Sequence, residues 1–228
     1  MILVAGSANL DFVVSASHIP APGETVLGQR FQTFPGGKGA NQAVACARAG
    51  GADTHMLLAI GPDDYAKPLL ESLTSANVAL HTVAGTESTG CAFICVSDDG
   101  ENAITVAPGA NMQLQSQHLL EHLPGLVGVS HLLLQLETPM ATVEAYAQHA
   151  KQLGVQVVLN AAPAQGLSDT LLANLDVLVV NEGELFEVAA AKLGQRPDRM
   201  EHALQALNVP TDRKSTLNSS HSVVSRMP

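Results

Sequence analysis

The chain has 228 residues, of which 46% are hydrophobic and 14% are charged, and its formal net charge is −10. This length allows one large domain or two small ones with a sizeable core, and the negative charge disfavours nucleic-acid binding, which needs clustered Lys and Arg. No apolar run reaches the about 18 residues of a membrane span, and the opening MILVAGSANL does not resemble a signal peptide. We therefore expect a cytoplasmic protein that binds neither nucleic acid nor a membrane.

Strand-like apolar segments run through the chain, and helical stretches separate several of them. In chain order the predicted strands are ILVAG, FVVS, RFQTF, HMLLAI, CAFICVS, NAITV, HLLLQLE, VQVVLN and DVLVVN. The predicted helices cover Asn41–Ala49, Asp63–Ser75, Met140–Leu153 and Glu182–Leu193. Continuously apolar strands that alternate with helices are typical of a parallel sheet buried on both faces. We therefore expect an α/β fold with a mostly parallel sheet covered by helices.

Four of the predicted strands differ from the others. FVVS, RFQTF, CAFICVS and NAITV are short, show polar alternation and are joined by turns such as SDDGEN. They fall roughly within residues 12–34 and 90–107. This pattern predicts a small antiparallel sheet appended to the main one.

The stretch FPGGKGANQAVACARAG, residues 34–50, places glycines and a lysine at the start of a predicted helix. It is not a P-loop, because Gly39 rather than Ser or Thr follows Lys38, and it does not match the G-x-G-x-x-G of a Rossmann fingerprint. Gly37 allows the backbone to approach a ligand closely, and Lys38 and Asn41 share a helix face. The stretch predicts a site for hydroxyl oxygens or an anion; the alternative is a glycine-rich turn before a core helix.

A second candidate contact lies in GSANLD, directly after the first predicted strand. Asn9 and Asp11 are two residues apart, so they point to the same side of an extended chain. An amide and a carboxylate placed in this way can bind neighbouring hydroxyl groups. The alternative is an Asx turn that leads out of the sheet.

Polar residues also end three of the apolar strands: Glu137 follows HLLLQL, Asn160 follows VQVVL and Asn181 follows DVLVV. In open α/β sheets, ligands bind at this carboxyl edge. Asn181 and Glu184 form N-x-x-E at the start of a helix, where Glu184 can hold Mg²⁺ beside the phosphates of a nucleotide. The alternatives are an N-cap for Asn181 and a favourable helix-dipole position for Glu184.

Taken together and in this order, the motifs resemble the PfkB carbohydrate kinase family, and within it the ribokinases. They are GSANLD, PAPGET, FPGGKGANQAVACARAG, GPDD, ESTGCAFICVSDDGEN, APGAN, QLETP and NEGEL. The resemblance spans about residues 2–211. It implies a Rossmann-like (ribokinase-like) α/β domain with a small antiparallel β lid that closes over the sugar, and a homodimer in which the lids of two copies meet.

The resemblance also implies an activity, which is transfer of the γ-phosphoryl group of ATP to the 5-hydroxyl of D-ribose. The alternatives are a fructokinase-like or nucleoside kinase of the same family, or a non-catalytic sugar-binding module. By motif match the sugar-binding residues are Asn9, Asp11, Gly37, Lys38, Asn41 and Glu137. Asn181 and Glu184 match the motif that organises Mg²⁺ and the ATP phosphates, with Glu184 toward the metal. An activating monovalent cation, K⁺, is expected only in full-length members.

The last seventeen residues, 212–228, differ from the rest: six are Ser or Thr, and Asp212 is the only acid. Their beginning, DRKSTLNSSH, resembles the translation of a sequencing adapter. We therefore expect a C-terminally truncated domain, residues 1–211, followed by a non-native or disordered tail. The 228 residues contain no G-A-G-D motif, which in the resembled family supplies the aspartate base. We thus expect no useful turnover, and an unpaired apolar sheet edge that promotes aggregation.

Overall fold

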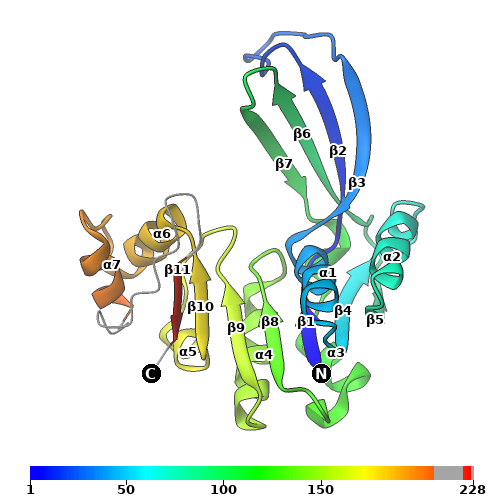
Figure 1. Cartoon of the computed structure of the whole chain (residues 1–228). Coiled ribbons are helices and arrows are strands. Elements are labelled where there is room, and N and C mark those ends of the chain that lie inside the picture. The colour runs from blue at the N-terminus through cyan, green and yellow to red at the C-terminus, as the bar shows by residue number, and fades with distance from the viewer. Residues whose placement is uncertain (208–222, 227–228) are drawn as a thin grey trace.

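The computed structural model describes residues 1–207 and 223–226, and the body of the molecule is a seven-stranded sheet (Figure 1). The strand order is β11-β10-β9-β8-β1-β4-β5. The strands are β1 (Ile2–Ala5), β4 (Thr54–Ile60), β5 (Ala79–Ala84), β8 (His131–Leu134), β9 (Gln156–Asn160), β10 (Val177–Val180) and β11 (Val223–Arg226). Every neighbouring pair is parallel except β10 and β11, so the predicted mostly parallel sheet is confirmed.

Helices cover both faces of this sheet. Met56 and Leu58 of β4 join one apolar cluster with α1 and α2, whereas Leu57 joins a larger cluster on the other face with α3 to α7. The helices are α1 (Lys38–Gly50), α2 (Ala66–Ser75), α3 (Ser116–His122), α4 (Met140–Gln152), α5 (Asp169–Ala173), α6 (Glu182–Leu193) and α7 (Met200–Ala206), with the short 3₁₀ helices η1 (Gly109–Gln113) and η2 (Pro124–Leu126). Within residues 1–207 and 223–226, no helix has the length and apolar character to cross a membrane.

A second, four-stranded sheet rises from the main body, and we call it the lid (Figure 1). Its order is β3-β2-β6-β7, and its strands are β2 (Asn9–Ala16), β3 (Arg30–Gly36), β6 (Gly90–Ser97) and β7 (Asn102–Ala107). The lid is mixed rather than antiparallel, because β2 and β6 are parallel. The reason is that β2 continues from β1 and β6 follows β5, two strands that point the same way in the main sheet.

Several described elements were not predicted from the sequence, and they include β5, α3, α5, the two 3₁₀ helices and β11. The edge strand β5 has His81 and Thr82 in its middle, and α3 is only seven residues long. The strand β11 lies in the tail expected to be non-native or disordered. Its Val223–Arg226 pair with Val177–Val180, so β10 is not the unpaired edge that we expected. The other tail residues lie outside the described part of the chain.

Three histidines meet where β4, β5 and α3 come together, and they make stability sensitive to acid. A ring nitrogen of His55 lies 2.9 Å from one of His81, and the rings of His81 and His122 pack edge to face. Burial, followed by the nearby His55 and His122, lowers the pKa of His81. The unfolded chain therefore takes up a proton before the folded one does, and stability is lost as the pH falls below about 6.5.

We expect His81→Phe to reduce the loss of melting temperature between pH 7.5 and pH 5.5 by roughly 2 °C. The comparison needs the wild type in the same buffers, since carboxylates also titrate in this range. His202→Gln, at an exposed position of α7, serves as the control. If the melting temperatures of the wild type and His81→Phe change identically with pH, this histidine cluster does not contribute to the acid sensitivity of stability.

Candidate functional site

The beginning of α1 lies directly against the end of β1, and glycine makes this contact possible. Gly37, the N-cap of α1, has φ 91°. A Cβ atom at Gly37 would lie 2.7 Å from Ala8 Cα, and a Cβ atom at Gly39 would lie 2.7 Å from the backbone of Ser7. The N-terminal amides of the helix are thus brought to the carboxyl edge of the main sheet, as the glycines predicted.

Glu137 links this helix start to the strand β8. Its Oε2 accepts a hydrogen bond from the Ser7 hydroxyl (2.5 Å) and another from the Lys38 backbone N–H (3.0 Å). The Gly39 N–H in turn donates to Ser7 Oγ (3.2 Å). A carboxylate at a helix N-terminus is favoured by the unpaired N–H groups and the helix dipole, and these two hydrogen bonds hold Glu137 in one position.

Asp11 supplies a second carboxylate beside the first. It is half-buried on β2, and its Oδ2 would lie 2.2 Å from a Cβ atom at Gly36. Burial, and then the negative charge of Glu137, raise the pKa of Asp11. Two neighbouring carboxylates repel an anion and accept hydrogen bonds from neutral hydroxyl groups, so this part of the site suits a polyol better than a phosphate.

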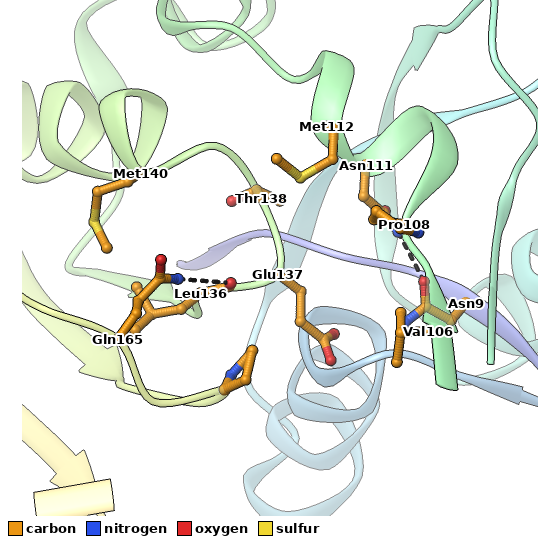
Figure 2. Close-up of a pocket in the computed structure, with 11 residues that line it drawn as sticks. Asn9, Val106, Pro108, Asn111, Met112, Leu136, Glu137, Thr138, Met140 and Gln165 are labelled. Atoms are coloured by element: carbon orange, nitrogen blue, oxygen red, sulfur yellow. Dashed lines mark hydrogen bonds between the residues drawn. The ribbon is translucent and has the colours of Figure 1, made fainter. Parts of the chain in front are cut away.

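Asn9 and Glu137 face a common pocket of about 320 Å³ (Figure 2). Asn9 is only 2% exposed, and its Oδ1 accepts a hydrogen bond from Nδ2 of Asn111 (2.7 Å). Apolar side chains form much of the remaining wall, and they include Val106, Pro108, Met112, Leu136, Met140 and Pro163. The pocket therefore has a polar floor at the edge of the sheet and an apolar wall.

The six predicted sugar-binding residues lie near the point where the lid joins the main sheet, and one of them, Asn41, lies at the edge of this group. Asn9 and Glu137 line the pocket, and Gly37 and Lys38 contact them from α1. Asp11 lies near enough to Glu137 for the charge of Glu137 to contribute to its raised pKa. Asn41 is exposed on the first turn of α1.

The predicted nucleotide residues lie at the carboxyl end of β10, further along the same edge. Asn181 caps α6: its Oδ1 accepts from the Glu184 N–H and Glu184 Oε2 accepts from the Asn181 N–H, both at 2.8 Å. The N-cap alternative is therefore correct as a structural description. Among residues 1–207 and 223–226, no group of three His, Cys, Asp or Glu side chains is arranged to hold a metal ion. A site with one carboxylate still suits Mg²⁺ that keeps waters and phosphate ligands.

Two residues of the site were missed in the sequence. Ser7, in GSANLD, is fully buried and bonds to Glu137. Asn111, in APGAN, is 1% exposed and bonds to Asn9 across 102 positions of sequence. Spacing gives no signal for either contact, because both depend on which loops meet at the sheet edge.

The fold and the site define an α/β domain with a pocket of mixed polar and apolar lining where a β lid joins the main sheet. The chain belongs to the pfkB family of carbohydrate kinases, whose family model matches residues 1–216. The ribokinase of Haemophilus influenzae is 44% identical over 186 residues, which are 80% of this chain and 60% of that protein. The ribokinase of Bacillus subtilis is 39% identical over 80% of this chain and 62% of its own length.

Solved structures agree with this membership. The ribokinase from Thermotoga maritima superposes with a TM-score of 0.77 at 34% identity, covering 91% of this chain and 67% of that one. Arabidopsis thaliana ribokinase, solved in complex with ribose and ATP, gives a TM-score of 0.74 at 31% identity and the same two coverages. The chain therefore spans about three-fifths to two-thirds of the length of these relatives.

Proposed function

We propose that this chain carries the sugar-binding part of an ATP-dependent kinase that phosphorylates D-ribose at its 5-hydroxyl. The observation that carries the proposal is the pair of carboxylates, Asp11 and Glu137, held at the start of α1 beside Asn9. Such a site accepts hydrogen bonds from several hydroxyl groups at once. The ribokinase names of the relatives support ribose among the possible polyols.

The proposal is tested by titrating the 228-residue protein with ribose, fructose and adenosine in a calorimeter. Ribose is expected to bind most tightly and to raise the melting temperature. Tighter binding of fructose or adenosine would favour a fructokinase-like or nucleoside kinase function instead. If none of the three binds, the sugar-site proposal is wrong.

For the second substrate, we propose that the carboxyl end of β10 receives ATP. Glu184 would hold Mg²⁺ through water, and the metal would offset the negative charge of the phosphates. The capping box fixes Glu184 at the helix start, where anions are favoured. Since the G-A-G-D motif is absent from these 228 residues, we expect binding without useful turnover. Ribose-dependent ADP release above that of a Glu184→Ala variant would contradict this expectation, and K⁺ activation can be assayed only if such release occurs.

Sugar affinity is expected to depend on pH through Asp11. Sugar hydroxyls donate to the ionised carboxylate, so binding favours the deprotonated form. Because the pKa of Asp11 is raised by burial and by Glu137, affinity should fall on acidification sooner than an ordinary aspartate would cause. Calorimetric ribose titrations between pH 7.5 and pH 4.5 measure the effect. Asp11→Asn is expected to bind more weakly and with a flatter profile; an unchanged slope would exclude Asp11 as the cause.

We further propose that two copies associate through the lid. Phe12 stacks between Phe31 and Phe93, with ring centroids 6.2 and 5.4 Å away, yet Phe31 is 63% and Phe93 is 53% exposed. Exposed aromatic groups of this kind mark association surfaces. Light scattering after gel filtration should give a dimer for the wild type and a monomer for Phe93→Asp. Val127→Asp, at an 84% exposed position outside the lid, should leave the mass unchanged.

A further inference from the structure

We infer that Asn111 is a positioning residue: it turns the Asn9 amide so that Asn9 presents its NH₂ group, a hydrogen-bond donor, to the ligand. This inference rests on the proposed sugar-binding function. It concerns the direction of one hydrogen bond in the pocket, between Asn9 and an oxygen of the sugar.

The orientation of Asn111 is fixed by the backbone of Ala8. The Ala8 N–H can only donate, and it donates to Asn111 Oδ1 (3.0 Å). The Ala8 carbonyl can only accept, and it accepts from Asn111 Nδ2 (3.2 Å). Both bonds require the same assignment of the Asn111 amide, with its oxygen toward the Ala8 N–H and its nitrogen toward the Ala8 carbonyl.

This orientation decides how Asn9 is turned. The second proton on Asn111 Nδ2 is donated to Asn9, which must therefore offer its Oδ1 (2.7 Å). The Asn9 NH₂ group lies on the other branch of the amide, and Asn9 lines the pocket (Figure 2). Asn9 and Asn111 are 2% and 1% exposed, so water does not compete for the bond between them.

The surrounding backbone leaves room for this pair and for little else. A Cβ atom at Gly90, the first residue of β6, would lie 2.2 Å from Asn111 Nδ2 and 2.3 Å from Asn9 Oδ1. Asn9 is also the first residue of β2 and is in register with Gly90. The hydrogen bond therefore lies where two lid strands leave the main body.

With this orientation, Asn9, Asp11 and Glu137 together offer both donors and acceptors to the hydroxyl groups of a sugar. Asp11 and Glu137 are acceptors, so they bind the hydrogen atoms of sugar hydroxyls. A donor at Asn9 binds a hydroxyl oxygen, so that the site can satisfy both atoms of a hydroxyl group. Without Asn111, the Asn9 amide can rotate and present an acceptor, which cannot bind an oxygen lone pair.

A double-mutant cycle on the 228-residue protein tests the inference, with ribose affinity measured by calorimetry. Asn111→Asp is expected to weaken binding by about tenfold, and Asn9→Ala by a similar factor. The double variant should be no weaker than Asn9→Ala, because Asn111 acts through Asn9. Losses that multiply to about 100-fold, or an Asn111→Asp variant with wild-type affinity, would overturn the inference.

Two further variants separate positioning from stability. Asn9→Asp keeps the oxygen that bonds to Asn111 and, when ionised, has no donor, so at a pH where it is ionised it should lose about tenfold in ribose affinity; wild-type affinity there would refute the donor role, and a thermal melt reports separately the cost of the buried charge. Gln113→Ala is the matched control, because Gln113 lies in the same η1 helix and bonds to Thr86 and to the Glu87 N–H without touching Asn9. It should lower the melting temperature and leave ribose affinity unchanged.

An NMR measurement keeps the inference testable if the wild type does not bind ribose, an outcome that contradicts the proposed function alone. The side-chain NH₂ signals of Asn9, assigned with Asn9→Ala, should shift in Asn111→Asp and stay in place in Gln113→Ala. Asn9 signals that Asn111→Asp leaves unmoved would show that Asn111 does not orient the amide.

Discussion

Replacing Glu137 with alanine should weaken ribose binding by about 100-fold, since it removes a charged acceptor whose hydrogen bonds contribute about 1.5–3 kcal/mol each. The same change leaves the Ser7 hydroxyl and the Lys38 N–H without their shared acceptor. We therefore also expect a lower melting temperature. Calorimetry with ribose and a thermal melt measure the two effects separately.

Two variants control for this result. Glu137→Gln retains an oxygen acceptor without the charge, so its affinity should fall between those of the wild type and Glu137→Ala. Glu71→Ala removes an exposed carboxylate on α2 and should change neither affinity nor melting temperature. If Glu137→Ala binds ribose as the wild type does, the sugar site lies elsewhere.

Gly37→Ala is the second substitution from which we expect a large effect, and here the effect is on folding. A Cβ atom at this position would meet Ala8 Cα and the Asn9 nitrogen at 2.7 Å, and φ is +91°. Strain of the left-handed backbone and overpacking together should cost about 3 kcal/mol. For a chain of this size the melting temperature should drop by about 6–12 °C.

The matched control for Gly37→Ala is Gly154→Ala. Gly154 also has a positive φ, +75°, but nothing lies within 4 Å of its would-be Cβ atom. It should therefore show only the smaller backbone cost. Equal losses for the two variants would mean that the close approach of α1 to the end of β1 does not matter for stability.

The parts of the fold with a strong local signal were predictable. Continuous apolar runs identified β1, β4, β8, β9 and β10. Of these, β1 and β4 contribute side chains to the apolar clusters on both faces of the sheet, whereas β9 and β10 contribute to one cluster only. The strand β5, whose apolar residues are interrupted by His81 and Thr82, and the short helix α3 gave no comparable signal. The parallel pairing of β2 with β6 depends on how two distant strands leave the main sheet, which no local pattern records.

The candidate site was likewise predictable only in part: the sequence placed several of its residues but not the contacts between them. Glycine spacing placed Gly37 and Lys38 at a helix start, and the strand ends placed Glu137 at the carboxyl edge. The contacts that hold these groups were not predictable, because Ser7 meets Glu137 across 130 positions and Asn111 meets Asn9 across 102. The N-x-x-E pair remained ambiguous because one geometry serves both a helix cap and a ligand.

The strands β2, β3 and β6 of the lid come together where they leave the main body, and this arrangement has a mechanical consequence. The first residues of β2 and β6 are paired with each other, and Asn9 is also paired with Gly36 at the end of β3. A slight rotation of the lid about these paired residues, Asn9, Gly36 and Gly90, would move the distant turns, near residues 17–29 and 98–101, through a much longer arc (Figure 1). A change in the length or composition of those turns would therefore leave the pairing of Asn9, Gly36 and Gly90 unaltered.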